Sequence, residues 1–328
     1  MTPKPLLPVY ISVPHGGLWV PPEVKPYCRL DLPAILKDGD TWTYALYNLK
    51  GRVLAYARFP VARAVVDVNR AAGDRPPDNP DGVVKTVTVD NEPVWADPQG
   101  LSPEQVERLL ERYYEPYHRR LSRASQNRNI LLGLDCHTML NRAPSIASRP
   151  SEQRPLVCLS NGGDERGEAL DGEAVTAPPS LLRALGKALE RQLEDKGLEM
   201  GVPVVWLNRP FRGGHIIQRH GSGAGQGYGD GYDCGGGHWQ GCGCPSGNEH
   251  GYQHENVHGH RNWHKYGHDK DHAHRHRGSR PLPWIQVEFN RALYLRTEPV
   301  TAKPPGEVVL HLNDLRRRFV QALETLFQ

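Results

Sequence analysis

The sequence predicts an α/β fold with a mostly parallel or mixed sheet covered by helices. Short apolar runs rich in β-branched residues recur along the 328 residues. Several runs are apolar at every position, as is typical of strands buried on both faces. Amphipathic helical patterns lie between the runs, and this alternation favours a parallel, helix-covered sheet. Because ligands of such sheets bind at the carboxyl ends of the strands, polar residues that follow the runs become the candidates for function.

Seven apolar runs are the predicted strands, and each is four to six residues long. They cover residues 9–13, 53–57, 64–68, 130–134, 156–159, 202–207 and 284–289. The first predicted helix begins at Ser102, because Pro103 suits the first helical position and Gln105 completes a capping box. A second helix is predicted from about residue 180 to a stop at Gly197, and a third covers 313–327.

One segment, 221–280, does not follow this pattern. Thirteen of the 34 glycines fall between residues 221 and 251, and ten of the 16 histidines fall between 238 and 276. Three of the six cysteines also lie there. Such a composition cannot bury enough apolar surface to offset its ordering entropy. We therefore predict a disordered Gly/His/Cys-rich insertion in one catalytic domain made of residues 1–220 and 281–328.

Composition and charge exclude several classes of protein. The net charge of +3 is small for this length and argues against a dedicated nucleic-acid binder. The sequence has no run of about 18 apolar residues, so a transmembrane helix is not expected. The first residues lack the basic-then-apolar layout of a signal peptide. The expected location is therefore the cytoplasm, and the expected partner is a small molecule rather than a nucleic acid or a membrane.

Polar groups that follow the predicted strands suggest a metal site. His15 follows the first strand, and His137 follows the strand at 130–134 with Asp135 beside it. Asp38 and Asp40 form a carboxylate pair that opens a predicted helix, where an N-cap would account for one of the two. Two histidines and a carboxylate from separate chain segments are compatible with a catalytic zinc site that leaves one position open for water. Asp135 would then fix the ring tautomer of His137.

Two further groups could act on a substrate. Asn69 and Arg70 end the run at 64–68 and could donate to a substrate carboxylate, although a salt bridge of Arg70 to Asp67 or Asp74 explains the pattern equally well. Gln286, Glu288 and Asn290 share one face of the last strand, and a polar strand face needs partners. Glu288 is the natural general base for an activated water.

These residues belong to short motifs whose order resembles that of the N-formylglutamate amidohydrolase family. The resemblance spans nearly the whole chain outside the insertion. The motifs are His15-Gly16-Gly17, Asp38-Gly39-Asp40, Asp67-Val68-Asn69-Arg70, Asp135-Cys136-His137-Thr138, Asn208-Arg209-Pro210-Phe211-Arg212-Gly213-Gly214-His215 and Gln286-Val287-Glu288-Phe289-Asn290-Arg291. The absence of an HExxH helix and of a GxSxG elbow excludes thermolysin-like and serine-hydrolase chemistry.

The resemblance implies a zinc-exopeptidase-like fold, similar to zinc carboxypeptidases and aspartoacylases, and a bound Zn²⁺ or another divalent metal. It implies His15 and His137 as ligands together with an acidic residue. The carboxypeptidase pattern has a glutamate three residues after the first histidine, where this chain has Leu18. We therefore expect Asp40 as the third ligand, with Asp38 and Glu23 as alternatives.

The same resemblance implies roles for the remaining polar residues. It implies Glu288 as the base, Arg63 near the oxyanion, and Asn69 and Arg70 on the substrate carboxylate. Arg212, with Gly213 and Gly214 beside it, would hold a second carboxylate of an acidic N-acyl amino acid such as N-formyl-L-glutamate. The alternatives are deacylation of other N-acyl amino acids, carboxypeptidase-like cleavage, or non-enzymatic metal buffering by the insertion.

The insertion has its own possible metal sites. Histidines recur there at four-residue spacing, which in a helix would form a one-sided imidazole ladder for zinc, nickel or copper. The alternative is low-complexity sequence without a function. The candidate ligands are His254, His258, His260, His264, His268 and His272.

Overall fold

The computed structural model describes residues 5–143, 151–223, 281–296 and 299–328. They form one mixed six-stranded sheet in the order β2-β1-β3-β6-β4-β5. Every neighbouring pair is parallel except β4 and β6, which are antiparallel. The predicted α/β class is therefore confirmed. The strands are β1 (Leu7–Val13), β2 (Val53–Arg58), β3 (Leu132–Met139), β4 (Val157–Ser160), β5 (Val205–Leu207) and β6 (Trp284–Asn290).

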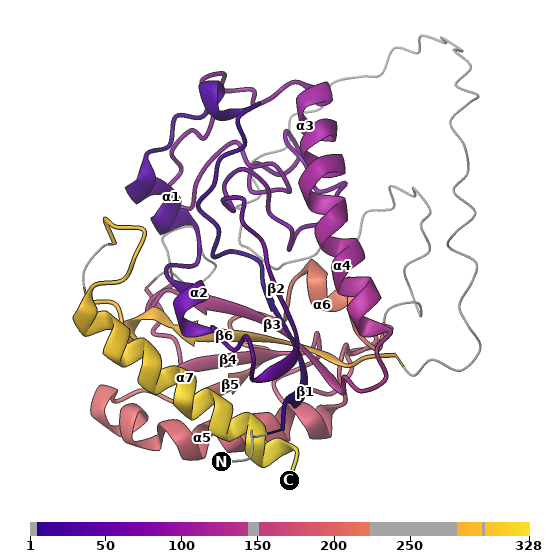
Figure 1. The fold of residues 1–328 in the computed structure, drawn as a ribbon, viewed down its shortest axis with the longest axis vertical. Coiled ribbons are helices and arrows are strands. Elements are labelled where there is room, and N and C mark those ends of the chain that lie inside the picture. The colour runs from indigo at the N-terminus through magenta and orange to yellow at the C-terminus, as the bar shows by residue number, and fades with distance from the viewer. Residues whose placement is uncertain (1–4, 144–150, 224–280, 297–298) are drawn as a thin grey trace, which may run out of the picture.

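Helices cover both faces of the sheet (Figure 1). The long helices α5 (Pro179–Met200) and α7 (Gly306–Leu326) lie side by side on one face, with α2 (Thr43–Leu46) against α7. The other face is covered by α4 (Glu115–Ser125) and α6 (His215–His220). The remaining helices are α1 (Leu32–Asp38), α3 (Pro103–Leu109) and the short turns η1 (Lys25–Tyr27), η2 (Leu110–Tyr114) and η4 (Arg291–Leu293).

The helix predicted from Ser102 is confirmed, and so is its capping box. The Ser102 side chain accepts from the backbone of Gln105, and the Gln105 side chain accepts from the backbone of Ser102. The helix runs on into α4 through η2, a π turn. Pro116 follows that turn and cannot donate a backbone hydrogen bond, which is a common cause of such irregularity. The turn brings Tyr114 to the Arg70 carbonyl, to which its hydroxyl donates at 2.9 Å.

The alternation of side chains divides the sheet into an apolar face and a polar face. Val9 and Ile11 of β1, Leu134 of β3, and Val287 and Phe289 of β6 belong to the core under α5 and α7. The intervening residues point to the opposite face. There, the strand register aligns Ser12 with Asp135, Asp135 with Gln286, and His137 with Glu288. The buried polar side chains of three neighbouring strands therefore lie together.

Three predicted element boundaries were wrong. Residues 64–68 form turns rather than a strand, because their apolar side chains pack into the core beside α4 while their backbone bonds locally, with Val65 N and Val66 N donating to Ala62 O. Strand β3 extends to Met139, so His137 lies inside the strand and not beyond it. Asp38 closes α1 and does not open a helix.

Three smaller differences concern helix and strand lengths. Helix α5 continues past Gly197 and ends at Met200. Helix α7 begins at Gly306, because Pro305 precedes its first turn and Val308 and Leu312 extend the buried stripe. Strand β5 begins at Val205 instead of residue 202; Pro203, just before it, has no backbone donor and only accepts, from Leu156 N at 3.0 Å.

The predicted insertion, 221–280, lies outside the described residues apart from 221–223. The start of the insertion and the strand that follows it meet at one residue: Ser222 N and Trp284 N both donate to the Thr176 carbonyl, at 3.0 and 2.9 Å. Within the described part of the chain, no helix is long and apolar enough to cross a membrane. The cysteines described there, Cys28, Cys136 and Cys158, are free thiols.

A group of three buried or partly buried histidines lies between α4 and α6, near the start of β6. His118 Nε2 donates to Val68 O at 3.0 Å, so its Nδ1 accepts from His220 Nε2, also at 3.0 Å. The two rings are stacked, and His215 packs edge-on against His118. Burial, together with the charge of Arg219, lowers the pKa of His215 to about 4 and that of His220 to about 3.

Candidate metal centre and active site

Two histidines and one aspartate converge near the carboxyl ends of β1 and β3. The Nδ1 atoms of His15 and His137 are 3.1 Å apart. Asp40 Oδ2 lies 3.0 Å from His137 Nδ1 and 3.6 Å from His15 Nδ1. All three side chains are buried. Across the described ranges, this is the one group of three or more His, Cys, Asp or Glu side chains whose possible ligand atoms all lie within 4.8 Å of one another.

A buried carboxylate holds each histidine from behind. His15 Nε2 donates to Asp67 Oδ1 at 2.7 Å, and His137 Nε2 donates to Asp135 Oδ2 at 2.8 Å. We place the ring protons on Nε2 because a carboxylate can only accept. The tautomer-fixing partner predicted for His137 is therefore present, and His15 has an equivalent one. Both Nδ1 lone pairs then face each other and Asp40, an arrangement typical of metal-binding histidines.

The positions of these two nitrogen atoms and one carboxylate oxygen fit a divalent metal. Three acceptor atoms separated by 3.0 to 3.6 Å repel one another unless a proton or a cation lies between them. A tetrahedral zinc ion with bonds of about 2.0–2.1 Å separates its ligands by roughly 3.3–3.4 Å. Two neutral imidazoles and one carboxylate are also a ligand set that zinc and similar ions accept.

Asp40 is oriented by groups on its other side. Arg291 Nη2 lies 3.4 Å from Asp40 Oδ1 and 2.6 Å from Gly39 O, and Thr138 N donates to Asp40 Oδ2 at 3.2 Å. Burial alone would raise the pKa of Asp40, but the adjacent His137 and His15 outweigh it and hold the pKa well below its usual range. Asp40 is therefore ionised, as a ligand must be.

The two alternative ligands lie elsewhere. Asp38 forms a fully buried ion pair with Lys85, with 2.8 Å between Oδ1 and Nζ, and the same oxygen accepts from Val89 N. Glu23 accepts from Tyr113 OH at 2.8 Å and pairs with Arg112 at 3.2 Å. Both acids thus have structural partners, and the structure brings Asp40 to the histidines in their place.

Glu288 lies beside this group, paired in register with His137. Burial raises its pKa to about 6, although the neighbouring His137 opposes the rise. Gln286 Nε2 donates to Glu288 Oε1 at 2.9 Å, while Gln286 Oε1 accepts from Gly214 N at 2.7 Å. The predicted polar face of this strand therefore has partners. A carboxylate with a pKa near neutrality is suited to exchange protons at physiological pH.

Asn69 lies between His137 and α6. Its Nδ2 lies 3.4 Å from His137 Nε2, and its Oδ1 accepts from Ile216 N at 2.8 Å. Gly214 permits this contact, because a Cβ there would come within 2.3 Å of Asn69 Nδ2. Gly213 precedes it with a φ of +110°.

The three arginines predicted for the site all contact carboxylates. Arg63 Nε donates to Asp67 Oδ2 at 3.0 Å, behind His15. Burial would lower the pKa of Arg63, but Asp67 and other acids raise it well above the usual value. Arg70 pairs with Asp81 at 2.6 Å, not with Asp67 or Asp74 as the salt-bridge alternative supposed, and Arg212 pairs with Glu173 at 2.6 Å. A substrate carboxylate at Arg70 or Arg212 would compete with those partners.

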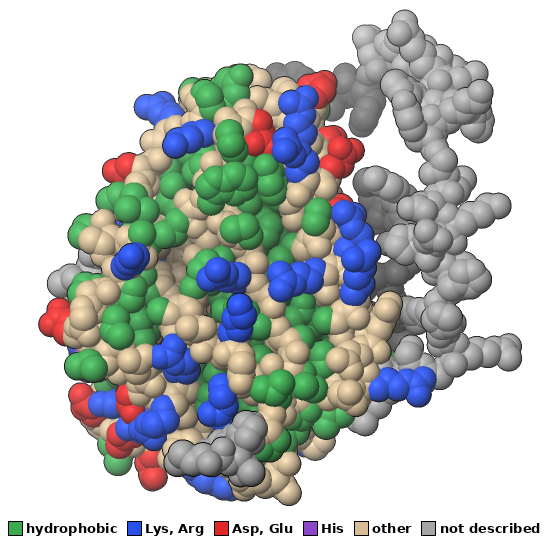
Figure 2. All heavy atoms as spheres, viewed as in Figure 1, with side chains coloured by type: hydrophobic (Ala, Val, Ile, Leu, Met, Phe, Trp, Pro, Cys, Tyr) green, Lys and Arg blue, Asp and Glu red, His purple; other side chains and the backbone are tan. Residues whose placement is uncertain are grey.

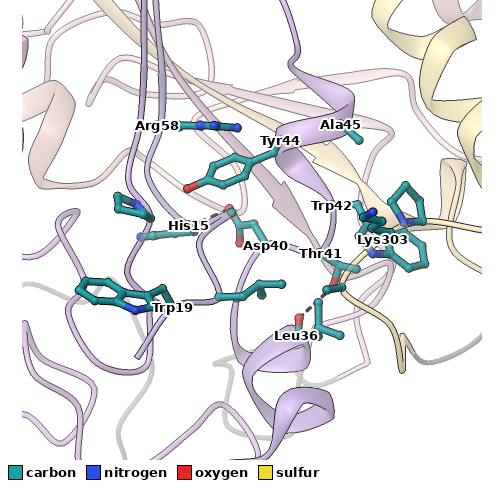
Figure 3. Close-up of a pocket in the computed structure, with 16 residues that line it drawn as sticks. His15, Trp19, Leu36, Asp40, Thr41, Trp42, Tyr44, Ala45, Arg58 and Lys303 are labelled. Carbon is teal, nitrogen blue, oxygen red and sulfur yellow. Dashed lines mark hydrogen bonds and ion pairs between the residues drawn. The ribbon is translucent and has the colours of Figure 1, made fainter. Parts of the chain in front are cut away.

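A pocket of about 410 Å³ opens to solvent, and His15 and Asp40 form part of its wall (Figure 3). The loop after β1 passes close to the end of β2 at this point. A Cβ on Gly17 would lie 2.3 Å from the Pro60 carbonyl oxygen, so glycine is required for the approach. Sequence reasoning missed three features here: Asp67 as the partner of His15, Arg291 as the partner of Asp40, and this pocket. Asp67 and Arg291 belong to the sequence motifs given above, but no local sequence pattern indicates which residues they contact.

Comparison with known proteins agrees with the pattern of motifs. The sequence model of the N-formylglutamate amidohydrolase family matches residues 7–228. An N-formylglutamate deformylase of Pseudomonas putida is 29% identical over a 230-residue alignment that covers 66% of this chain and 76% of that protein. Among solved structures, an N-formylglutamate amidohydrolase from Ralstonia eutropha JMP134 superposes with a TM-score of 0.60 at 20% identity, covering 99% of this chain and 96% of the other. A gene product of Agrobacterium tumefaciens gives 0.52 at 12% identity, with coverages of 97% and 90%. These two likenesses concern the fold.

Proposed function

The chain belongs to the N-formylglutamate amidohydrolase family, a family of amide-hydrolysing enzymes, and we propose that it hydrolyses N-formyl-L-glutamate to formate and glutamate with a divalent metal ion. His15, Asp40 and His137 would hold that ion, with Zn²⁺ as the first choice. One observation carries the metal proposal: three acceptor atoms face one another at 3.0 to 3.6 Å, and each histidine has a carboxylate on its other nitrogen. A relation to zinc carboxypeptidases and aspartoacylases belongs to the same proposal.

The reaction divides between the ion and the protein. When bound, such an ion lowers the pKa of water from 15.7 towards about 7 and polarises a carbonyl oxygen. Glu288 accepts a proton from the attacking water while the oxygen of that water adds to the formyl carbon. Glu288 then returns that proton to the glutamate nitrogen as the C–N bond breaks, which balances the hydrolysis. Its raised pKa, about 6, suits a group that must both take and give a proton near neutrality.

Other residues of this chain position the reacting groups. Asp67 and Asp135 keep the histidine rings in one tautomer and one orientation. Arg63 neutralises part of the charge of Asp67 and is the candidate donor to the developing oxyanion. Asn69 and Arg70 are the candidates for the substrate α-carboxylate. For Arg70, this role requires the substrate to displace Asp81.

The test is a product assay on the metal-loaded full-length protein. We expect formate and glutamate to appear in equal amounts from N-formyl-L-glutamate. N-acetyl-L-glutamate and a dipeptide with a free carboxylate serve as the alternative deacylase and carboxypeptidase substrates. Faster turnover of either would replace formylglutamate as the substrate, and no turnover of any of them would refute the function. Tight metal binding without turnover would favour the metal-buffer alternative.

The extra metal sites predicted in the insertion remain a separate proposal. Those histidines lie outside the described residues, and the hydrolytic proposal does not depend on them.

A further inference from the structure

The pocket that reaches His15 and Asp40 has walls of two kinds. Most of its lining is apolar and comes from the loop after β1 and from the segment around α2. Trp19, Leu36, Trp42 and Tyr44 are among its large apolar side chains (Figure 3). Such walls suit the methylene carbons of a ligand, whereas the His15 and Asp40 end suits its reacting amide.

Two cations line the same pocket, and they come from distant parts of the sequence. Arg58 ends β2, and its guanidinium lies 5.2 Å from the centre of the Tyr44 ring. Lys303 precedes α7 and lies across the pocket, near Trp42 (Figure 3). Both residues are exposed. Arginine over an aromatic ring keeps its N–H groups free to bind a carboxylate with two hydrogen bonds.

Neither cation is neutralised within the described part of the chain. No carboxylate described there lies within 4.0 Å of Arg58 or Lys303, whereas Arg70 and Arg212 each have an acid at 2.6 Å. Asp40, the acidic residue in the pocket wall, already contacts the two histidines and Arg291. Figure 2 shows basic side chains over the region of α2 and β2, with acidic side chains mainly towards the rim of this face. The pocket therefore has excess positive charge, which favours an anion.

The backbone that carries Lys303 is anchored to the pocket wall. Trp42 Nε1 donates to Thr301 O at 3.1 Å, and Thr301 Oγ1 donates to Lys303 O at 2.7 Å. Trp42 itself has a left-handed backbone, with φ of 55°, a conformation that costs a non-glycine residue energy and must be held by its contacts. One tryptophan thus links the segment after Asp40 to the loop that presents Lys303.

We propose that Arg58 and Lys303 form an anion subsite that binds the side-chain carboxylate of the substrate while its N-acyl amide lies at His15 and Asp40. This inference rests on the proposed function and assigns to these two residues the selection of a substrate whose side chain ends in an anion. The α-carboxylate would remain with Asn69 and Arg70. A substrate with two carboxylates would then be held on both sides of its amide.

The test compares N-formyl-L-glutamate with N-formyl-L-glutamine, which has the same shape but no side-chain charge. We expect the ratio of their kcat/KM values to fall about tenfold in Arg58→Met and in Lys303→Met, and further in the double variant, because each loses a charge-assisted contact. Lys187→Met is the matched control, since Lys187 is exposed on α5 and outside the pocket. It should leave both rates unchanged. Arg70→Met should lower both rates together and leave the ratio unchanged.

A binding measurement separates this inference from the proposed function. Calorimetry should show that wild type binds glutarate more tightly than its monoamide, and that the Arg58 and Lys303 variants lose that preference. If wild type hydrolyses both formyl substrates and the ratio is unchanged in the double variant, the subsite is wrong and the function stands. If wild type hydrolyses neither, the function fails, and the glutarate preference still decides the subsite. A ratio that collapses in Arg70→Met alone would assign the side-chain carboxylate to Arg70 and overturn the inference. Thermal unfolding of each variant confirms that it is folded.

Discussion

Replacing Asp135 with asparagine removes the negative charge behind His137 while every hydrogen bond of that side chain can still form. Asp135 is fully buried and has two partners, His137 Nε2 at 2.8 Å and Ser12 Oγ at 2.9 Å. In the variant, the amide oxygen still accepts from His137, and the amide nitrogen can donate to Ser12. Ser12 then donates to Tyr117 OH, which lies 2.9 Å away. The substitution therefore tests the charge and leaves the shape unchanged.

The expected magnitude follows from the loss of that charge. A hydrogen bond to a charged acceptor contributes about 1.5–3 kcal/mol, against about 0.5–1.5 kcal/mol for a neutral one. The difference of roughly 1.4 kcal/mol corresponds to about a tenfold weaker metal affinity. Asp135→Asn should thus raise the dissociation constant for zinc about tenfold, measured by competition with a chelator strong enough to keep weaker histidine sites empty.

The control removes a buried carboxylate that has no contact with either histidine. Asp38→Asn alters the buried pair with Lys85 and should destabilise the fold, but it should change zinc affinity by less than about threefold. An Asp135→Asn protein that is folded and binds zinc as tightly as wild type would refute the assigned role of Asp135. A large loss in Asp38→Asn at unchanged stability would return Asp38 to the ligand set.

Three further predictions concern the base, the insertion and acid stability. Glu288→Gln should keep the metal and the fold but lose about 10²–10⁴-fold in kcat, and a loss of only a few-fold would mean that another group is the base. Replacing 221–279 with a short glycine-serine linker should leave a folded, active core, because the start of the segment and the strand that follows it lie together at the Thr176 carbonyl. The replacement should also remove weak metal sites that calorimetry detects. Loss of hydrolysis with the core metal retained would place the segment in the active site. His215 and His220 take up protons near pH 6.5 when unfolded but only near pH 4 and 3 when folded, so the free energy of unfolding should decrease as pH falls below 6.5, by up to about 1.4 kcal/mol per pH unit for each. Urea titrations at several pH values should show a shallower decrease in His220→Gln, and an equal slope would contradict this account.

Uninterrupted apolar runs and strong helix caps were predictable from the sequence because their physical causes are local. The strands around Val9, Leu156 and Trp284 and the capped helix at Ser102 were predicted on this basis. Residues 64–68 were misassigned because β-branched side chains signal burial as much as strand formation, and here burial is achieved by turns.

The sequence predicted those site residues whose type indicates their chemistry and whose place in or after a strand fixes their position. His15, His137 and Glu288 follow or lie in strong strands, so the sheet brings them together. The partners of Asp67 and Arg291 depend on how loops fold back across the sheet. The same is true of Arg58 and Lys303, which are 245 positions apart in the sequence. No local sequence pattern indicates such contacts.

Metal content and formate release, measured on the same samples, test the central claim most directly. The samples are wild type and the variants His15→Ala, Asp40→Asn and His137→Ala, each loaded with zinc and then dialysed against a weak chelator. We predict that wild type retains one tightly bound metal ion and releases formate from N-formyl-L-glutamate. Each folded variant should lose both. Formate release by a variant that has lost the metal, or full retention of the metal in all three variants, would contradict the claim that His15, Asp40 and His137 form the catalytic metal centre.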